Sequence, residues 1–238
     1  MSETIIITGA TRGIGLALAN KFAECGYNLA LIARDEKTLK NIKEDLENKN
    51  NVKVNTYACD ISDYETVKQT ITELTKDVND IAALINNASV GHFALMKDLD
   101  VKLWQETINI NLLGTYYITK EILPKLLKQR RGDIINISSG AGNEGYSFCS
   151  AYSASKFGIA GFSESLMKEV RGYGIRVSLI NLDTVQTDMS SQSGLKVNQW
   201  NTIMEPSDVA EVVFYIKQLP KHIFFKETSL WNVCPDRN

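Results

Sequence analysis

Short apolar segments alternate with longer amphipathic segments along the whole of this 238-residue chain. The apolar segments are rich in Ile, Val and Leu with little polar alternation, which is typical of strands buried on both faces. Strands are predicted at Thr4–Thr8, Asn28–Ala33, Val52–Ala58, Ala82–Asn86, Asp133–Ser138, Ile175–Asn181 and Thr228–Val233. Helices are predicted between them at Gly13–Glu24, Glu36–Asn48, Tyr64–Lys76, Val101–Gln129, Tyr152–Tyr173 and Ser207–Gln218. This alternation predicts an α/β fold, a parallel sheet of about seven strands with helices on both faces.

The length of 238 residues fits either one large domain or two small ones. No repeat, low-complexity tract or linker divides the chain, so a single domain over residues 1–238 is predicted. The longest irregular stretch, from Thr187 to Met204, is rich in Ser, Gln and Asn. A loop of that length in a compact domain is either a lid or an unrecognised element, and residues 187–204 are interpreted as a substrate lid.

Composition and charge exclude several functional classes. The 26 basic and 28 acidic residues give a formal net charge of −2, so the chain is not a polycation suited to nucleic acid. The four cysteines form no CxxC pair and only two histidines occur, so neither a disulfide framework nor a metal site is expected. No apolar run approaches the roughly 20 residues of a membrane span. The four residues before Ile5 leave no room for a signal peptide, and a cytoplasmic protein without membrane partners is expected.

The segment Thr8-Gly9-Ala10-Thr11-Arg12-Gly13-Ile14-Gly15 joins the first predicted strand to the first predicted helix. Glycines permit a tight turn and let the backbone approach a pyrophosphate, and the helix N-terminus offers free N–H groups to the anion. The segment is either a plain strand-to-helix turn or a dinucleotide site. Its place at the first βα junction of an alternating chain favours the dinucleotide site.

Tyr152 and Lys156 are four residues apart in an apolar stretch with helical character, so both side chains reach one helix face. A phenol titrates at about pH 10, and a nearby ammonium group brings its pKa closer to neutrality. Ser139 ends the fifth predicted strand, and strand ends in a parallel sheet form a ligand crevice. The tyrosine and lysine are therefore either a surface pair or a proton-transfer pair beside a hydroxyl donor.

Five motifs follow one another in a fixed order: Thr8–Gly15, Asp60, Asn86-Asn87-Ala88, Asn111, and Ser139 with Tyr152-x-x-x-Lys156. In this order and spacing the sequence resembles the short-chain dehydrogenase/reductase family over essentially its whole length, with the features of an NADP-preferring carbonyl reductase. The resemblance implies a Rossmann-type doubly wound sheet. It also implies hydride transfer between a nicotinamide cofactor and a small carbonyl or alcohol substrate.

The resemblance implies four catalytic residues. Ser139 polarises the carbonyl oxygen, with Ser138 as the alternative, and Tyr152 supplies the proton. Lys156 lowers the pKa of the tyrosine and binds the nicotinamide ribose. Asn111 kinks its helix and holds a water molecule that links Lys156 to solvent.

The resemblance also assigns residues to the cofactor. They are Gly9, Thr11, Arg12, Gly13, Ile14, Gly15, Arg34, Asp60, Ile61, Asn87, Ala88, Tyr152, Lys156, Val185 and Thr187. Asp60 accepts from the adenine amino group while Ile61 lies against the ring, and helix capping is the alternative role for Asp60. Two positions depart from the family pattern: Ser89 replaces a glycine, and Leu182-Asp183 replaces Pro-Gly. Asp183 is interpreted as a solvated residue of a turn.

The second predicted strand ends in Ala33-Arg34-Asp35, so a basic and an acidic side chain compete for the adenosine ribose. An acid there binds the ribose hydroxyls of NAD, whereas a basic residue accommodates the 2′-phosphate of NADP. Asp35 superficially satisfies the NAD spacing, but the family's acidic position corresponds to Ala33. Arg34 together with Arg12 favours NADP(H), since guanidinium groups bind phosphate through charge-assisted hydrogen bonds. The alternative is that Arg34 and Asp35 form a solvated pair.

The substrate pocket is expected beside His92, Phe93, residues 142–149 and the loop after Thr187, where Tyr146, Phe148 and Trp200 supply aromatic rings. The helices predicted at 101–129 and 152–173 resemble those that build two-fold oligomers, so a homodimer or homotetramer is expected. Two other functions stay open. One is an NADP-binding regulator with little or no turnover, which Ser89 and the altered Pro-Gly position support. The other is an extended-type sugar epimerase, which needs a longer C-terminal region.

Overall fold

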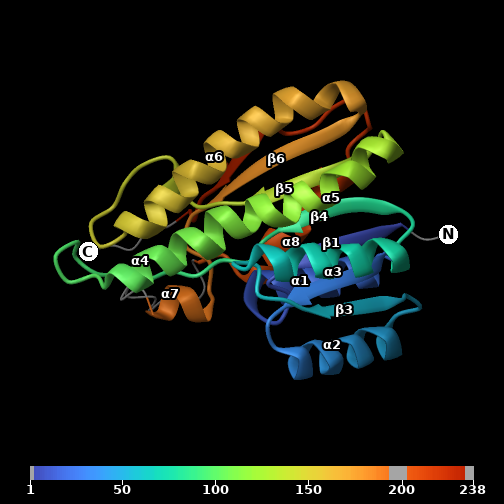
Figure 1. The fold of residues 1–238 in the computed structure, drawn as a ribbon, viewed down its shortest axis with the longest axis horizontal. Helices are drawn as coiled ribbons and strands as arrows, with labels where there is room; N and C mark the ends of the chain where they lie inside the picture. The colour runs from blue at the N-terminus through green and yellow to red at the C-terminus, as the bar shows by residue number, and fades with distance from the viewer. Residues whose placement is uncertain (1–2, 193–202, 234–238) are drawn as a thin grey trace.

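The centre of the computed structural model, which describes residues 3–192 and 203–233, is a seven-stranded sheet (Figure 1). Its strand order is β3-β2-β1-β4-β5-β6-β7, and every pairing between neighbours is parallel. The strands are β1 (Thr4–Thr8), β2 (Asn28–Ala33), β3 (Val54–Ala58), β4 (Ile81–Asn86), β5 (Gly132–Ile137), β6 (Ile175–Leu182) and β7 (Glu227–Leu230). The predicted parallel α/β sheet is therefore confirmed.

Helices cover both faces of the sheet, as predicted. They are α1 (Gly13–Glu24), α2 (Glu36–Lys49), α3 (Tyr64–Asp77), α4 (Val101–Ile108), α5 (Thr115–Gln129), α6 (Ser150–Val170), α7 (Asp188–Gln192) and α8 (Pro206–Gln218). Successive residues of β1 point to opposite faces, so Ile5 and Ile7 pack with α1, α2 and α8, whereas Ile6 packs with α3, α5 and α6. None of the helices within the described residues has the length and apolar character that a membrane crossing requires.

The long helix predicted over Val101–Gln129 is divided in the structure. Between α4 and α5 the chain forms a π-helical segment, Asn109–Gly114. Such segments are rare and often occur at functional sites. Here the side chain of Thr115 donates to the backbone carbonyl of Asn111 over 2.7 Å, and the Asn111 side chain itself turns away to other parts of the chain. The local irregularity expected around Asn111 therefore takes the form of a widened helical turn.

The last strand and the predicted lid also differ from expectation. The strand predicted at Thr228–Val233 covers Glu227–Leu230, because Asn232 donates its backbone N–H and side-chain amide to Asp183 and so leaves the sheet ladder. The predicted lid begins with the short helix α7, and the loop rejoins the described chain just before Met204, which pairs with Val185. Residues 193–202, which include Trp200, lie outside the described residues.

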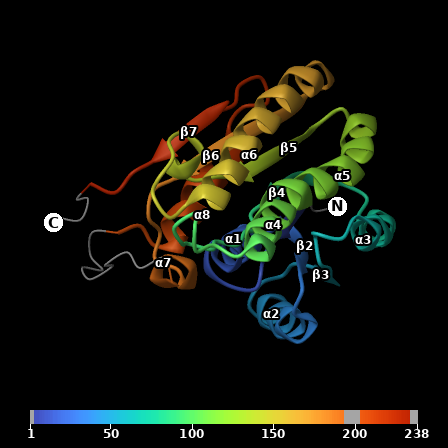
Figure 2. The ribbon, with the colours of Figure 1, turned by 60° about the vertical axis from the view of Figure 1, so that its left-hand side comes forward.

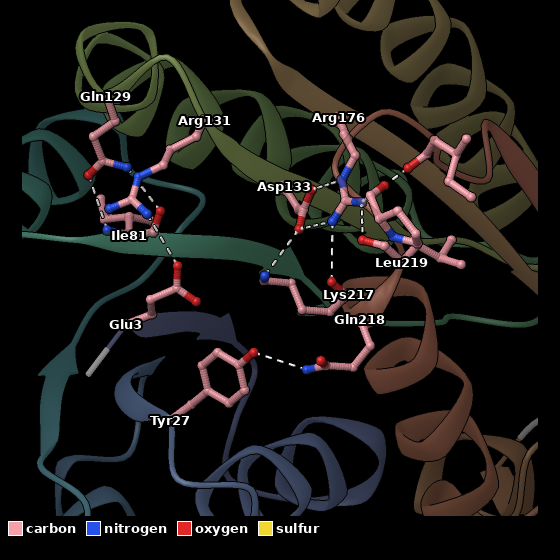
Figure 3. Close-up of polar contacts among 12 residues, drawn as sticks. Glu3, Tyr27, Ile81, Gln129, Arg131, Asp133, Arg176, Lys217, Gln218 and Leu219 are labelled. Atoms are coloured by element: carbon pink, nitrogen blue, oxygen red, sulfur yellow. Dashed lines mark hydrogen bonds and ion pairs between the residues drawn. The ribbon is translucent and has the colours of Figure 1, made fainter. Parts of the chain in front are cut away.

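Charged contacts fasten the chain at the amino ends of the strands (Figure 3). Arg176 of β6 donates Nε and Nη2 to the two carboxylate oxygens of Asp133 on β5, over 2.5 and 2.8 Å. The same guanidinium donates to the carbonyl of Leu219 over 3.0 Å, just beyond the end of α8. Nearby, Arg131 contacts Glu3 and Asp80, two residues at the starts of β1 and β4. These contacts stabilise the sheet at the amino ends of its strands. The carboxyl ends of the strands are left open for a ligand.

Candidate active site and dinucleotide cleft

A cleft of about 1400 Å³ follows the carboxyl ends of the strands. It crosses the boundary between β1 and β4, where the strand order reverses, which is the place where open α/β sheets bind ligands. All but two of the predicted site residues line it: Gly9, Thr11, Arg12, Gly13, Ile14, Arg34, Asp60, Ile61, Asn87, Ala88, Ser139, Tyr152, Lys156, Val185 and Thr187. Gly15 and Asn111 are the two that do not line the cleft.

In the glycine turn after β1, backbone atoms of separate segments lie in close contact. Gly9 has a φ of +68°, and a Cβ placed on it would lie 2.8 Å from the Cα of Ala88. A Cβ on Gly15 would lie 2.1 Å from the carbonyl oxygen of Gly9, so this glycine closes the turn and does not face the ligand. No side chain caps the N-terminus of α1, which leaves its first N–H groups to an anion. The cradle fits a pyrophosphate.

The end of β4 holds this turn in place. The backbone N–H groups of Asn87 and Ala88 donate to Oγ1 of Thr8 over 3.0 and 3.1 Å. The Asn87 amide donates to the carbonyl oxygens of Thr8 and Gly9 over 3.0 and 3.3 Å. Asn87 therefore joins β4 to the glycine turn and fixes the shape of the phosphate cradle.

The two charges after β2 have different environments. Asp35 caps α2: its carboxylate accepts from the backbone N–H and the hydroxyl of Thr38, over 3.0 and 2.6 Å. Both hydrogen bonds lower the pKa of Asp35, and the one from the Thr38 hydroxyl has the larger effect. Arg34 lines the cleft and forms no ion pair within the part of the chain that the structure describes. Both side chains are exposed, and no ion pair joins them within the described residues.

Arg12 and Asp60, two further predicted cofactor residues, are exposed. The Arg12 guanidinium lies 3.3 Å from the carboxylate of Asp188 on α7, and such solvent-exposed pairs contribute little to stability. Asp60 accepts from the backbone N–H and the hydroxyl of Ser62, over 2.9 and 2.7 Å. The residue that caps α3 is Asp63, so the capping role considered for Asp60 is wrong.

Ser139, Tyr152 and Lys156 meet on one wall of the cleft. Burial raises the pKa of Tyr152 to about 12, and hydrogen bonding with the hydroxyls of Ser139 and Ser89 opposes this rise. The hydroxyl of Ser138 is buried and forms no hydrogen bond with the described residues. The wall therefore presents a protonated phenol beside a serine hydroxyl, a pairing suited to donating hydrogen bonds to one oxygen atom.

Lys156 lies buried beside the Tyr152 ring. Its ammonium nitrogen donates to the carbonyl oxygen of Ile137 over 3.1 Å and lies 5.4 Å from the centre of the Tyr152 ring. The residue is only 3% exposed, and burial lowers its pKa to about 8. The hydroxyls of Ser139 and Ser89 lower the pKa of the phenol, and the Lys156 ammonium is held near the ring by its hydrogen bond to the Ile137 carbonyl.

Asn111 lies behind the catalytic wall and joins two segments. Its Oδ1 accepts from the backbone N–H of Val90 over 2.8 Å, and its Nδ2 donates to the Val90 carbonyl over 2.9 Å. The same Nδ2 donates to the hydroxyl of Ser155, the neighbour of Lys156, over 3.0 Å. Asn111 is fully buried, so its amide serves as an anchor between α6 and the segment that carries Ser89. The sequence did not reveal these two partners.

At the far end of the cleft, Phe93, Tyr146, Phe148, Met189 and Trp231 join Tyr152 in the lining. Met189 belongs to the loop after Thr187 that the sequence places at this border, whereas Trp231 was missed, because the segment after β7 approaches the site only through the fold. His92, expected at this border, contacts Glu106 instead and does not line the cleft. Of residues 142–149, only the last four line it.

Asp183 is not the solvated turn residue that was expected. Its Oδ2 accepts from the backbone N–H and the side-chain amide of Asn232, over 3.2 and 3.0 Å. The Asn232 amide also donates to the Thr184 carbonyl over 2.9 Å, and its oxygen accepts from the backbone N–H of Met204 over 2.8 Å. Asn232 therefore connects the loop after β6, the chain before α8, and the segment after β7.

Comparison with known proteins places the chain among oxidoreductases. The chain is 32% identical over 232 residues to sulfoacetaldehyde reductase 2 of Chromohalobacter salexigens, covering 94% of this chain and 91% of that one. It is 31% identical over 218 residues to a 3-oxoacyl-[acyl-carrier-protein] reductase of Aquifex aeolicus, covering 89% and 88%. An alcohol dehydrogenase of the archaeon Thermococcus sibiricus, solved in complex with 5-hydroxy-NADP, superimposes with a TM-score of 0.91 at 26% identity and full coverage of both chains.

The family model described as short chain dehydrogenase matches residues 3–198, from β1 through the catalytic wall and the loop after β6. The seven-stranded parallel sheet and the near full-length relatives agree with this match. The chain is therefore a member of the short-chain dehydrogenase family of oxidoreductases.

Proposed function

We propose that the protein is an NADP(H)-dependent oxidoreductase that transfers a hydride between nicotinamide and a small carbonyl or alcohol substrate, with Tyr152 as the acid and base. The observation that carries this proposal is the meeting of Ser139, Tyr152 and Lys156 on one wall of a cleft whose other end is the glycine turn. Bound along this cleft, the cofactor would supply the hydride, which is chemistry that no side chain provides.

In the direction of reduction, each residue acts on a defined atom. Ser139 donates to the carbonyl oxygen of the substrate and holds it beside the phenol of Tyr152. A phenol whose pKa is about 12 is protonated at neutral pH and can give its proton to the far more basic alkoxide that forms. Lys156 binds the nicotinamide ribose, and Asn111 keeps α6 in register with the segment of Ser89. Alcohol oxidation needs the phenolate and is therefore expected to require higher pH.

Several features support NADP(H) over NAD(H). Arg34 and Asp35 both line the adenosine end of the cleft, and the Asp35 carboxylate is engaged by the backbone N–H and the hydroxyl of Thr38. The exposed Arg12–Asp188 pair leaves a second guanidinium at the glycine turn that a 2′-phosphate would attract. The complex of the Thermococcus enzyme contains a modified NADP. We assign the remaining cofactor contacts to the predicted residues, with Asp60 and Ile61 at the adenine and with Val185 and Thr187 at the carboxamide.

We further propose that the chain is a single catalytic domain, acts in the cytoplasm and assembles as a homodimer or homotetramer. Exposed apolar side chains on α4, α5 and α6, among them Val101, Tyr116 and Phe157, support an oligomer. The helices α5 and α6 lie side by side on one face of the sheet and offer a continuous surface for a two-fold contact (Figure 2).

The proposed function is tested by following NADPH absorbance at 340 nm with the purified protein and a panel of aldehydes and ketones. We expect oxidation of NADPH with at least one carbonyl compound, and much slower oxidation when NADH replaces NADPH. Tight NADPH binding, measured by fluorescence, without turnover across the panel would instead support the NADP-binding regulator.

A further inference from the structure

The substrate end of the cleft is built from apolar and aromatic side chains that come from four separate segments. Phe93 follows β4, Tyr146 and Phe148 precede α6, Met189 lies on α7, and Trp231 follows β7. The ring centres of Phe93 and Tyr152 are 5.7 Å apart, so this surface reaches the reacting phenol. Tyr146, Phe148 and Trp231 are 46%, 54% and 62% exposed. Apolar side chains that gather in an exposed patch mark a surface that another molecule covers.

The backbone at Phe148 is held in a conformation that an aromatic residue rarely adopts. Its φ is +67°, in the left-handed region where bulky side chains are outliers. The carbonyl of Phe148 accepts from the backbone N–H of Ala94 over 3.0 Å, which ties the segment before α6 to the segment after β4. The Phe148 ring is about half exposed beside the cleft. Strain of this kind is concentrated at sites that bind ligands.

The charges around this end of the cleft are unfavourable for an anion. Of the three cations in the described lining, Arg34 follows β2 on the far side of the strand-order reversal, Arg12 lies at the glycine turn beside Asp188, and Lys156 is buried and bonded to the Ile137 carbonyl. The acids are placed differently. Asp183 lines the cleft, and the Tyr146 hydroxyl donates to the carboxylate of Glu144. A substrate carboxylate here would be desolvated near the like charges of Asp183 and Glu144.

We propose, on the basis of the proposed function, that the substrate is an uncharged carbonyl compound that carries an aromatic group. The aromatic group lies among Phe93, Tyr146, Phe148 and Trp231 while its carbonyl oxygen reaches Ser139 and Tyr152. Carboxylates and sulfonates are disfavoured because Asp183 and Glu144 carry like charge at this end of the cleft. The reaction itself is unchanged: a hydride adds to the carbonyl carbon, Tyr152 protonates the oxygen, and NADPH becomes NADP⁺.

Two pairs of 2-oxo compounds separate charge from aromatic character: phenylglyoxylate with its ethyl ester, and pyruvate with its ethyl ester. Initial rates of NADPH oxidation by the full-length protein give kcat/KM for each compound. We expect each ester to exceed its acid by about 100-fold, since a like charge in a desolvated site is costly. We also expect ethyl phenylglyoxylate to exceed ethyl pyruvate by about 10-fold, in proportion to the larger apolar area it buries.

The variant Trp231→Arg places a cation at the substrate end. We expect it to raise kcat/KM for phenylglyoxylate and to lower it for the ethyl ester, whereas Tyr215→Arg, at an equally exposed aromatic residue on α8 outside the cleft, should change neither. The inference is overturned if wild-type protein prefers either acid to its ester, or ethyl pyruvate to ethyl phenylglyoxylate. Absence of NADPH oxidation with all four compounds and with the wider carbonyl panel would contradict the proposed function itself.

Discussion

The ammonium nitrogen of Lys156 is bonded to the carbonyl oxygen of Ile137, the last residue of β5, and lies beneath the ring of Tyr152. The contact fixes the lysine on the strand and leaves the phenol to the hydroxyls of Ser139 and Ser89. The two groups therefore ionise in different pH ranges. The tyrosine keeps its proton well above neutral pH, whereas the lysine begins to lose its charge at about pH 8.

Replacement of the phenol tests the proton-transfer role directly. Tyr152→Phe keeps the ring and its contact with Phe93 but removes the proton donor. We expect kcat for carbonyl reduction to fall by about 10²–10⁴-fold, the usual contribution of a positioned acid, while the Kd for NADPH changes little. Stopped-flow kinetics and fluorescence titration measure the two quantities. Wild-type turnover in this variant would contradict the assignment.

Lys156 makes stability depend on pH. Its pKa is lowered from 10.5 to about 8 in the folded state, so between those values the unfolded chain binds more protons and the free energy of unfolding increases with pH. The full effect is at most about 1.4 kcal/mol per pH unit. Urea denaturation from pH 7 to 9.5, before tyrosines in the unfolded chain ionise, compares wild type with Lys156→Met. We expect the wild type to gain stability relative to the variant as pH rises, and parallel curves would show the lysine to be unperturbed.

Ser89 is a second hydroxyl beside the phenol. Its oxygen is buried, and its proximity to Tyr152 lowers the pKa of the phenol. Ser89→Gly should raise that pKa further. The increase of kcat/KM for alcohol oxidation with pH should therefore occur at higher pH than in the wild type. Ser147→Ala, at another serine of the cleft lining, is the matched control and should leave the profile in place. Identical pH profiles of kcat/KM for Ser89→Gly and wild type would show that Ser89 takes no part in proton transfer.

Arg34 is expected to select the phosphorylated cofactor. Arg34→Ala should raise KM for NADPH by about 10–100-fold, which corresponds to the loss of hydrogen bonds to a charged group. KM for NADH should change little, because NADH has no 2′-phosphate. Lys37→Ala removes a neighbouring cation outside the cleft and serves as the control. An equal rise for both cofactors would assign Arg34 to a general electrostatic role.

Local sequence patterns were sufficient for much of the fold. The strands β1 and β2 begin and end where the sequence predicted, because continuous apolar runs can only be buried inside a two-faced sheet. The glycine turn was equally predictable, since the backbone conformation and the close approach to Ala88 demand residues without Cβ. These features depend on residues that are close neighbours in the chain.

The features that the sequence did not reveal depend on distant partners. The π-helical segment accompanies bonds from Asn111 to Val90 and Ser155, which are 21 and 44 residues away. Arg12 meets Asp188 across 176 residues, and Trp231 enters the cleft lining only because β7 pairs with β6. Hydrophobic periodicity contains no information about such pairs, so the environments of Arg12, Asp183 and Lys156 had to be seen in the folded chain.

The bonds of Asn232 make three separate segments into one mechanical unit: the loop after β6, the chain at Met204, and the segment that carries Trp231. Replacing the loop after β6 with that of a relative would therefore break the hydrogen bonds of Asn232 unless the segment after β7 were replaced as well. We therefore expect substrate preference to depend on the loop after β6 and the segment after β7 together, so the two should be exchanged or randomised as a pair.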